Sequence, residues 1–110
     1  MSMITVTVFN KNHQIVGVQL EGHAEYGRRG RDIVCSAVSI LYINLVNSLE
    51  NFTNDEKELN GNKKINFQNV ILKSMPSSEA ELLFQSFMLG ITTIEQEYGR
   101  KYILIMNQEV

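Results

Sequence analysis

Residues that build disulfides and metal sites are scarce in this 110-residue sequence. It contains one cysteine and two histidines, which excludes an intrachain disulfide and a zinc site made of several cysteines. We therefore expect neither a metal nor another cofactor. An excess of charge of one sign is missing as well, with 10 Lys and Arg against 12 Asp and Glu. This balance argues against direct binding of nucleic acid.

A long apolar run and a basic leader are also missing from the pattern. No apolar run approaches the roughly 18 residues that a membrane span needs. The N-terminal segment lacks the basic stretch that opens a signal peptide. We expect a cytoplasmic protein without membrane contact. The sequence has 44% hydrophobic and 20% charged residues, which is typical of a folded protein, and its length predicts a single domain over residues 1–110.

The first half of the chain predicts two strands and a long helix. Residues 3–9 and 14–21 alternate with period two, and the short turn over residues 10–13 predicts an antiparallel hairpin. A helix is predicted from Asp32, as its N-cap, to about Phe52. Its main apolar stripe consists of Ile33, Ala37, Ile40, Leu41, Leu45, Ser48 and Leu49.

The second half predicts further strands around a second helix. Polar residues 54–62 are expected to form turns, and residues 64–75 one strand, or a strand pair with a break near Asn69. The second helix is predicted to begin at Pro76–Ser78 and to end at Gly99, with Gly90 marking close packing. Residues 100–107 indicate a buried strand. The apolar stripe of the second helix consists of Leu83, Phe87, Ile91, Ile94 and Tyr98.

The order β-β-α-β(β)-α-β predicts an α+β fold, namely a two-layer sandwich of a mainly antiparallel sheet and two helices. Periodicity does not give the strand order. A single sandwich cannot hide all the apolar surface of the helices, so we expect a homodimer that uses the helix faces or the sheet edge. The apolar residues off the main stripes are Val34, Val38, Tyr42 and Val46 in the first helix and Leu82, Phe84 and Met88 in the second.

The chemistry is concentrated between the second strand and the first helix. The segment from Gly22 to Arg31 contains three glycines and three arginines, and we expect a mobile loop there. Cys35 lies three residues after the predicted N-cap, where the free N–H groups of a helix lower a thiol pKa. His23, at the end of a strand, can come within reach of that thiol. A cysteine and a histidine are the minimum for nucleophilic acyl transfer, and the N–H groups at the helix start can hold an oxyanion.

Each of these residues also has a structural interpretation. A lone cysteine in an apolar helix is usually a small buried core residue. Asp32 is more commonly a helix cap than an orienting carboxylate, and Ser39, one turn after Cys35, more commonly bonds back to its own helix. His13, in the hairpin turn, is expected to lie on the surface without a function. Spacing alone therefore leaves the catalytic interpretation open.

Two motifs taken together are more specific. The strings Gly22-His23-Ala24 and Gly30-Arg31-Asp32-Ile33-Val34-Cys35-Ser36-Ala37-Val38-Ser39 resemble those of the ribosomal-processing cysteine protease (Prp) family of Firmicutes and related bacteria. The resemblance extends over the whole chain, including the leading strand and the late amphipathic helix. The sequence departs from the family at Ser36, where alanine is usual, and in the basic character of its loop.

The resemblance implies a peptidase that removes the short N-terminal extension of a large-subunit ribosomal protein, the one numbered twenty-seven. It implies a Cys–His dyad in which Cys35 is the nucleophile and His23 the base. Gly22, Asp32 and Ser39 are implied as supporting or substrate-binding residues. The family cuts after an aromatic residue and acts as a homodimer. Tyr42, Val38 or Phe87 can line the apolar hole that the aromatic residue needs.

Two other classes of function remain to be weighed. The main alternative is a non-catalytic ribosome-associated or scaffolding domain in which Cys35 is a buried core residue, and thiol alkylation separates the two. The sequence has no C-x-x-C pair, which argues against a thiol oxidoreductase. The phosphate-binding loop of a small phosphatase needs an arginine shortly after its cysteine. No arginine follows Cys35 until Arg100, which argues against this class as well.

Overall fold

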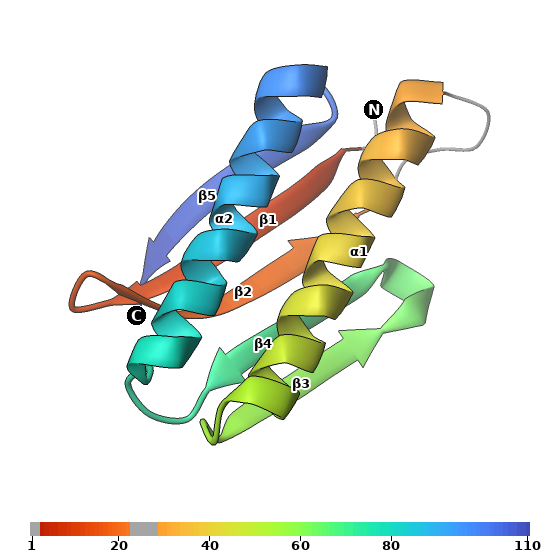
Figure 1. Ribbon diagram of the computed structural model, residues 1–110. Helices are drawn as coiled ribbons and strands as arrows, with labels where there is room; N and C mark the ends of the chain where they lie inside the picture. Colours follow the sequence, from red (N-terminus) through yellow and green to blue (C-terminus); the bar gives the residue numbers. More distant parts are fainter. Residues whose placement is uncertain (1–2, 23–28) are drawn as a thin grey trace.

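The chain forms a two-layer α+β sandwich in which both helices cover the same face of one sheet (Figure 1). The computed structural model describes the backbone of residues 3–22 and 29–110 and the side chains of residues 3–22 and 33–110. The elements within that part are β1 (Ile4–Lys11), β2 (Gln14–Glu21), α1 (Arg29–Phe52), β3 (Lys57–Asn62), the 3-10 helix η1 (Lys63–Ile65), β4 (Phe67–Leu72), α2 (Ser78–Tyr98) and β5 (Ile103–Glu109). The predicted fold class is confirmed.

The sheet has the strand order β3-β4-β2-β1-β5. All neighbouring strands are antiparallel except β1 and β5, which are parallel. Val18 lies at its centre, opposite Val8 on one side and Val70 on the other, and all three are almost free of solvent contact. This order places the C-terminal strand at one edge and β3 at the other, which the periodicity of the sequence could not reveal.

The predicted hairpin is confirmed, with a tight turn between β1 and β2. Asn12 and His13 both have positive φ, of 51° and 66°, as the two central residues of a type I′ turn require. The turn connects Lys11 directly to Gln14, which are paired in the ladder. His13 is therefore a surface residue of the turn, as expected.

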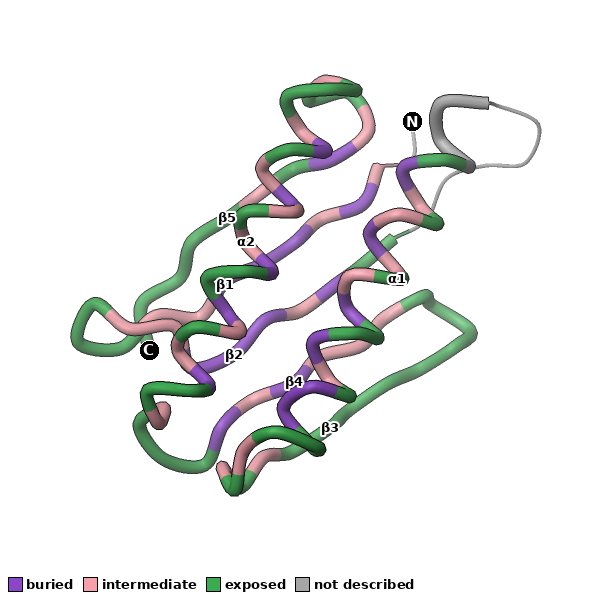
Figure 2. Tube along the Cα trace, viewed as in Figure 1, coloured by how far each residue is buried: buried purple, intermediate pink, exposed green. Residues whose placement is uncertain are grey.

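The first helix begins earlier and buries a different side than the sequence predicted. It starts at Arg29, so Asp32 lies in its first turn and is not the N-cap. Ile33 and Ile40, assigned to the core stripe, are 49% and 64% exposed. The helix is apolar on several sides, so periodicity alone did not identify which side the sheet would cover (Figure 2). The side that is buried consists of Val34, Val38, Tyr42, Leu45, Ser48 and Leu49.

The apolarity of α1 is also high enough to resemble a membrane span. Residues Ile33–Phe52 are long and apolar enough to cross a membrane by length and composition, with a mean hydropathy of 1.5. The expectation that no segment approaches this limit was therefore too strong. In the fold this helix packs on the sheet through fully buried residues such as Leu49, and a core helix has the same composition.

The second helix largely follows its prediction. Ser77 is the N-cap, its hydroxyl accepting a hydrogen bond from the Ala80 N–H, and Gly99 ends the helix with a φ of +92°. A Cβ atom at Gly90 would lie 2.8 Å from Leu41 Cδ1, which confirms the predicted close packing against α1. The buried residues are Ala80, Phe84, Phe87, Ile91 and Ile94. Phe84 thus belongs to the core and not to an off-stripe face, whereas Tyr98 is 38% exposed.

Both sheet edges differ from the prediction. Residues 57–62, expected to form turns, are strand β3. Residues 64–75 contain one strand, β4, which is the first of the two predicted alternatives, and there is no break near Asn69. Strand β3 is almost entirely exposed, so its sequence has no hydrophobic alternation that would predict a strand. It is recognised as a strand by its pairing with β4. The last strand begins at Ile103, which is buried, but most of β5 is exposed because it lies at the opposite edge.

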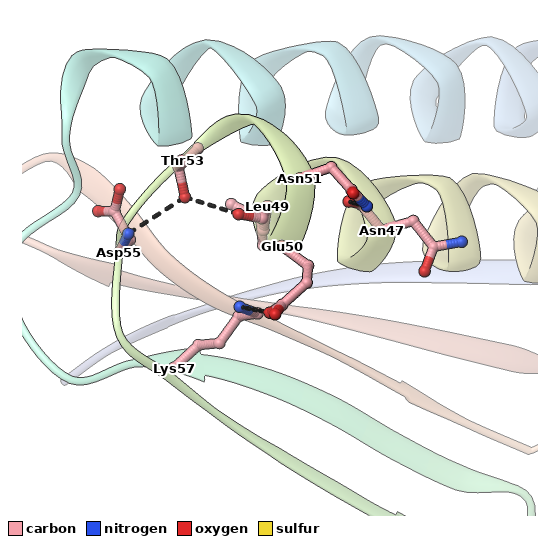
Figure 3. A network of polar contacts seen from close by, with 7 residues as sticks. All are labelled: Asn47, Leu49, Glu50, Asn51, Thr53, Asp55 and Lys57. Carbon is pink, nitrogen blue, oxygen red and sulfur yellow. Dashed lines mark hydrogen bonds and ion pairs between the residues drawn. The ribbon is translucent and has the colours of Figure 1, made fainter.

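Side chains close the C-terminal end of α1 (Figure 3), and one of them also ties it to α2. The Thr53 hydroxyl donates to the Leu49 carbonyl at 2.7 Å and accepts from the Asp55 N–H at 3.2 Å. The Asp55 carboxylate in turn accepts from the backbone N–H of Ser77, at 2.8 Å, and from its hydroxyl. One aspartate therefore holds the N-cap of the second helix beside the end of the first.

We expect Asp55→Asn to lower the free energy of unfolding by about 1 kcal/mol, the usual net value of such a hydrogen bond. Partial burial opposes ionisation, but the hydrogen bonds from Ser77 prevail and hold the Asp55 pKa below its ordinary 3.8. A lowered folded-state pKa stabilises the protein above pH 3.8, and this contribution is lost as the pH falls through the folded value. Urea unfolding at pH 7 and at pH 2 measures both effects.

The matched control for that substitution is Glu56→Gln, which removes the next carboxylate in the chain, an exposed one. The control should unfold like the parent at both pH values. If Asp55→Asn and the parent differ as much at pH 2 as at pH 7, the carboxylate does not hold the cap of α2.

Candidate active site

One pocket, of about 320 Å³, contains three of the five predicted site residues. Cys35 and Ser39 line it from successive turns of α1, and Gly22 lines it from the end of β2. Cys35 is a free thiol that is neither fully buried nor exposed, with one side against the hydrophobic core. A cysteine that lines a pocket in this way can meet a ligand, which a residue enclosed by the core cannot.

The position of Cys35 in the helix corrects one expectation. Because α1 begins at Arg29, Cys35 lies in its second turn and not three residues after a cap. The N–H groups without intrahelical partners are those of residues 29–32, which excludes the N–H of Cys35 itself. Helical side chains tilt toward the N-terminus, however, so the Cys35 side chain leans toward that first turn. The Cys35 thiol is thus directed toward the N-terminal end of α1, where free N–H groups can bind an anion.

Gly22 occupies a backbone conformation that only glycine adopts easily. Its φ is +85°, and a Cβ atom there would collide with the carbonyl oxygen of Met3. Its N–H donates to the Asn66 carbonyl at 3.1 Å. Gly22 therefore turns the chain sharply at the end of β2, between the start of β1 and the β3–β4 connection. Gly22 is the last described residue before His23 in the sequence.

The β3–β4 connection supplies a wall of the pocket that the sequence analysis missed. Asn62, Lys63 and Asn66 line the pocket together with Phe67 and Gln68 at the start of β4. The Asn62 side chain caps η1 by accepting from the Lys64 N–H at 3.0 Å, and Asn66 ends it with a φ of 49°. No sequence signal links these residues to the cysteine, because their proximity depends on the pairing of β4 with β2.

The remaining predicted residues have different outcomes. His23 lies outside the described residues. Asp32 lies in the first turn of α1, and its side chain is outside the described part of the chain. Of the three residues suggested for an apolar hole, Val38 lines the pocket with Cys35, whereas Phe87 is buried between the helices and does not. Tyr42 lines a second hollow, between α1 and β3.

A second hollow, the α1–β3 groove, lies further along α1 than the cysteine pocket. Its volume is about 380 Å³, and it shares Gln68 with the pocket. Burial raises the pKa of Tyr42 from its ordinary 10.0 to about 12. The residues that define the groove are Tyr42, Ile43, Val46, Asn47, Leu59, Asn60, Gly61 and Gln68.

The described lining of the pocket suits thiol chemistry. Among the side chains described by the structure, no three His, Cys, Asp or Glu gather as a metal site would need. Lys63 is the one charged residue lining the pocket in the described part of the chain. A pocket with a thiol, a hydroxyl and several amide groups can bind a peptide backbone and attack its carbonyl.

Comparisons with known proteins agree with this chemistry. The family model described as cysteine protease Prp matches residues 3–103. The ribosomal processing cysteine protease Prp of Staphylococcus aureus is 30% identical over 98 residues, which covers 88% of this chain and 92% of that protein. A structure of a Streptococcus mutans protein has a TM-score of 0.83 and 34% identity, and covers 97% of each chain.

Structures of the S. aureus protease are also similar. Its complex with a substrate peptide has a TM-score of 0.87 and 26% identity, and covers 96% of this chain and 100% of that one. Its complex with a covalently linked product peptide has a TM-score of 0.81 and 27% identity, over 98% and 100%. The match of the family model over residues 3–103 and the 30% identity shared with a curated member lead to one conclusion. This chain belongs to the family of cysteine protease Prp and is a cysteine protease.

Proposed function

We propose that this protease removes the short N-terminal extension of the large-subunit ribosomal protein numbered twenty-seven, with Cys35 and His23 as its catalytic dyad. The observation that carries the proposal is the free thiol of Cys35 in a pocket that also contains Gly22, the residue directly before His23. The S. aureus relative, whose name includes ribosomal processing, supports the substrate class. We infer that the reaction takes place in the cytoplasm.

The proposed reaction proceeds in two stages. His23 takes the proton from Cys35 Sγ, and the thiolate attacks the scissile carbonyl carbon. Backbone N–H groups in the first turn of α1 stabilise the oxyanion of the tetrahedral intermediate. The C–N bond breaks as His23 gives its proton to the leaving amine, which leaves an acyl group on Sγ. Water, deprotonated by His23, then cleaves the thioester and restores the thiol.

The supporting residues have distinct proposed roles. Gly22 sets the direction in which the chain leaves β2, and so the position of His23. Ser39 lies one turn beyond Cys35 and lines the pocket, where its hydroxyl can bind the substrate backbone. Asp32 lies in the first turn of α1, and acidic residues near a helix N-terminus are generally stabilising. Its proposed role in the reaction is to orient His23.

The active form is proposed to be a homodimer. Four of the off-stripe residues first considered for the interface, Val34, Val38, Tyr42 and Phe84, are buried in the core and cannot form it. The helices do expose apolar residues one heptad apart, and one of them, Leu82, belongs to the same off-stripe set. These are Ile33 and Ile40 on α1, 49% and 64% exposed, and Leu82 and Leu89 on α2, 67% and 72% exposed. Contact between helix faces of two copies would cover them.

We expect Cys35→Ser to fold like the parent and to lose cleavage of a peptide that spans the processing site of the host ribosomal protein. The matched control is Ser36→Ala, because Ser36 is the next residue on α1 but is exposed, and alanine is usual there in the family. The control should retain activity. Mass spectrometry of the products measures cleavage. If Cys35→Ser cleaves the peptide at the parental rate, Cys35 is not the nucleophile.

Substitution of the proposed base should affect the rate more than the fold. General base catalysis contributes about a hundredfold to ten-thousandfold, so His23→Ala should lose at least about a hundredfold in kcat. His13→Ala is its control, since the only other histidine lies in the hairpin turn. Thermal unfolding measured alongside separates the two roles, and a His23→Ala variant that unfolds would identify a structural histidine instead.

The dimer is tested by mass in solution. We expect multi-angle light scattering at micromolar concentration to give about twice 12.6 kDa for the parent protein. The double substitution Ile40→Ser and Leu89→Ser should shift it toward the monomer, because each removes an exposed apolar side chain from the proposed contact. A parent mass of 12.6 kDa would exclude the dimer.

A further inference from the structure

The turn before β4 contains a residue in the left-handed region of the backbone. Asn66 ends η1 with a φ of 49° and a ψ of 55°, a conformation that glycine and asparagine adopt readily and that β-branched residues rarely adopt. Its N–H donates to the Lys63 carbonyl at 3.4 Å, which closes the turn. Phe67 begins β4 directly after it. The direction of the Asn66 carbonyl therefore depends on the left-handed backbone at this one position.

That carbonyl accepts the hydrogen bond from the Gly22 N–H. The bond measures 3.1 Å and lies one residue beyond the last pair of the β2–β4 ladder, in which Glu21 is opposite Phe67. Gly22 is also constrained on another side, because a Cβ atom there would collide with the Met3 carbonyl oxygen. The bond to Asn66 thus ties Gly22 to the turn before β4 at the point where β2 has ended.

We propose that Asn66 is a positioning residue for the catalytic dyad, because its left-handed backbone directs the carbonyl that holds Gly22, the residue before His23. This inference rests on the proposed function, since it takes His23 as the base that serves Cys35. Asn66, Gly22 and Cys35 line the same pocket, so a displaced turn reaches the reacting groups. Proton transfer requires a base within hydrogen-bond reach of the thiol. A change at position 66 therefore acts on the rate through Gly22.

A second asparagine with the same backbone conformation provides a matched control. Asn12, in the hairpin turn, has a φ of 51° and is exposed, as Asn66 is. The two asparagines lie at opposite ends of β2, since the hairpin turn comes before this strand and Gly22 after it. Substitution of either by a β-branched residue strains the backbone for the same reason. Of the two, Asn66 is the one whose carbonyl holds Gly22, so the pair separates stability from positioning.

The first test makes the same substitution at both positions. Asn66→Val should lower kcat for the peptide that spans the processing site about tenfold to a hundredfold, with little change in KM, because a misplaced base slows proton transfer and leaves peptide binding intact. Asn12→Val should lower the melting temperature as much as Asn66→Val does, by about 4 °C, and keep the parental kcat. Asn66→Gly is the conservative variant, because glycine adopts this φ without strain, and its kcat should stay within about threefold of the parent.

Three results of this comparison overturn the inference. A parental kcat in Asn66→Val shows that the turn does not position the dyad. An equal loss of kcat in Asn12→Val shows that lower stability alone slows the reaction. A loss in Asn66→Gly as large as that in Asn66→Val shows that the side chain, and not the backbone, acts on the substrate. If Asn66→Val does not fold, the less strained pair Asn66→Ala and Asn12→Ala is compared in the same way.

Alkylation of Cys35 by iodoacetamide tests the same inference without a peptide. The thiolate is the reactive form, and a neighbouring histidine promotes it, so His23→Ala should slow alkylation about tenfold. Asn66→Val should slow alkylation by a comparable factor when His23 is present. In the His23→Ala background the same substitution should change the rate by less than about twofold, because two changes that act through one group are not additive.

The alkylation rates distinguish failure of this inference from failure of the proposed function. Absence of peptide cleavage by the parent contradicts the proposed substrate, and the alkylation rates still decide the role of Asn66. Equal alkylation of the parent and Asn66→Val overturns the inference. A slowing by Asn66→Val that is as large in His23→Ala as in the parent overturns it as well, because Asn66 then acts without the histidine. Equal alkylation of the parent and His23→Ala contradicts the dyad itself, and the inference falls with it.

Discussion

Packing of one side of α1 on the sheet is the interaction on which the site depends. Val34, Val38 and Leu49 lose nearly all solvent contact there, and burial of a side chain of this size contributes about 1.5–3 kcal/mol. Successive helical residues are about 100° apart, so the burial of Val34 and Val38 also fixes the direction of Cys35 and Ser39. Both then lie at the margin of the buried side, facing the pocket. The thiol is presented by hydrophobic packing and not by a dedicated loop.

Strand order completes the site with residues far from the cysteine in the sequence. Because β4 pairs with β2, with Phe67 opposite Glu21, the turn before β4 lies beside Gly22. The hydrogen bond from the Gly22 N–H to the Asn66 carbonyl joins the two segments. The same glycine cannot accept a side chain because of the Met3 carbonyl. Gly22 is thus a motif residue with a structural cause, since three segments meet at its backbone.

The two-layer architecture also explains why a cysteine protease of this size has two hollows beside the helix that carries Cys35. Two helices cover the centre of a five-stranded sheet and leave both edges with little cover (Figure 2). At the β3 edge this leaves the α1–β3 groove open next to the cysteine pocket. An extended peptide can lie along such a surface without a deep cavity, which suits a protease.

The sequence by itself determined the fold class, the hairpin, both helices and the limits of α2, because these follow from local periodicity, turn residues and caps such as Ser77 and Gly99. Its two motifs also identified Cys35, Gly22 and Ser39, which the pocket brings together. Only the tertiary structure decided which side of α1 is buried, that residues 57–62 form an edge strand, and that Asn66 lies beside Gly22. These features depend on pairing and packing between distant segments, for which a helix that is apolar on several sides and a polar edge strand carry no local signal.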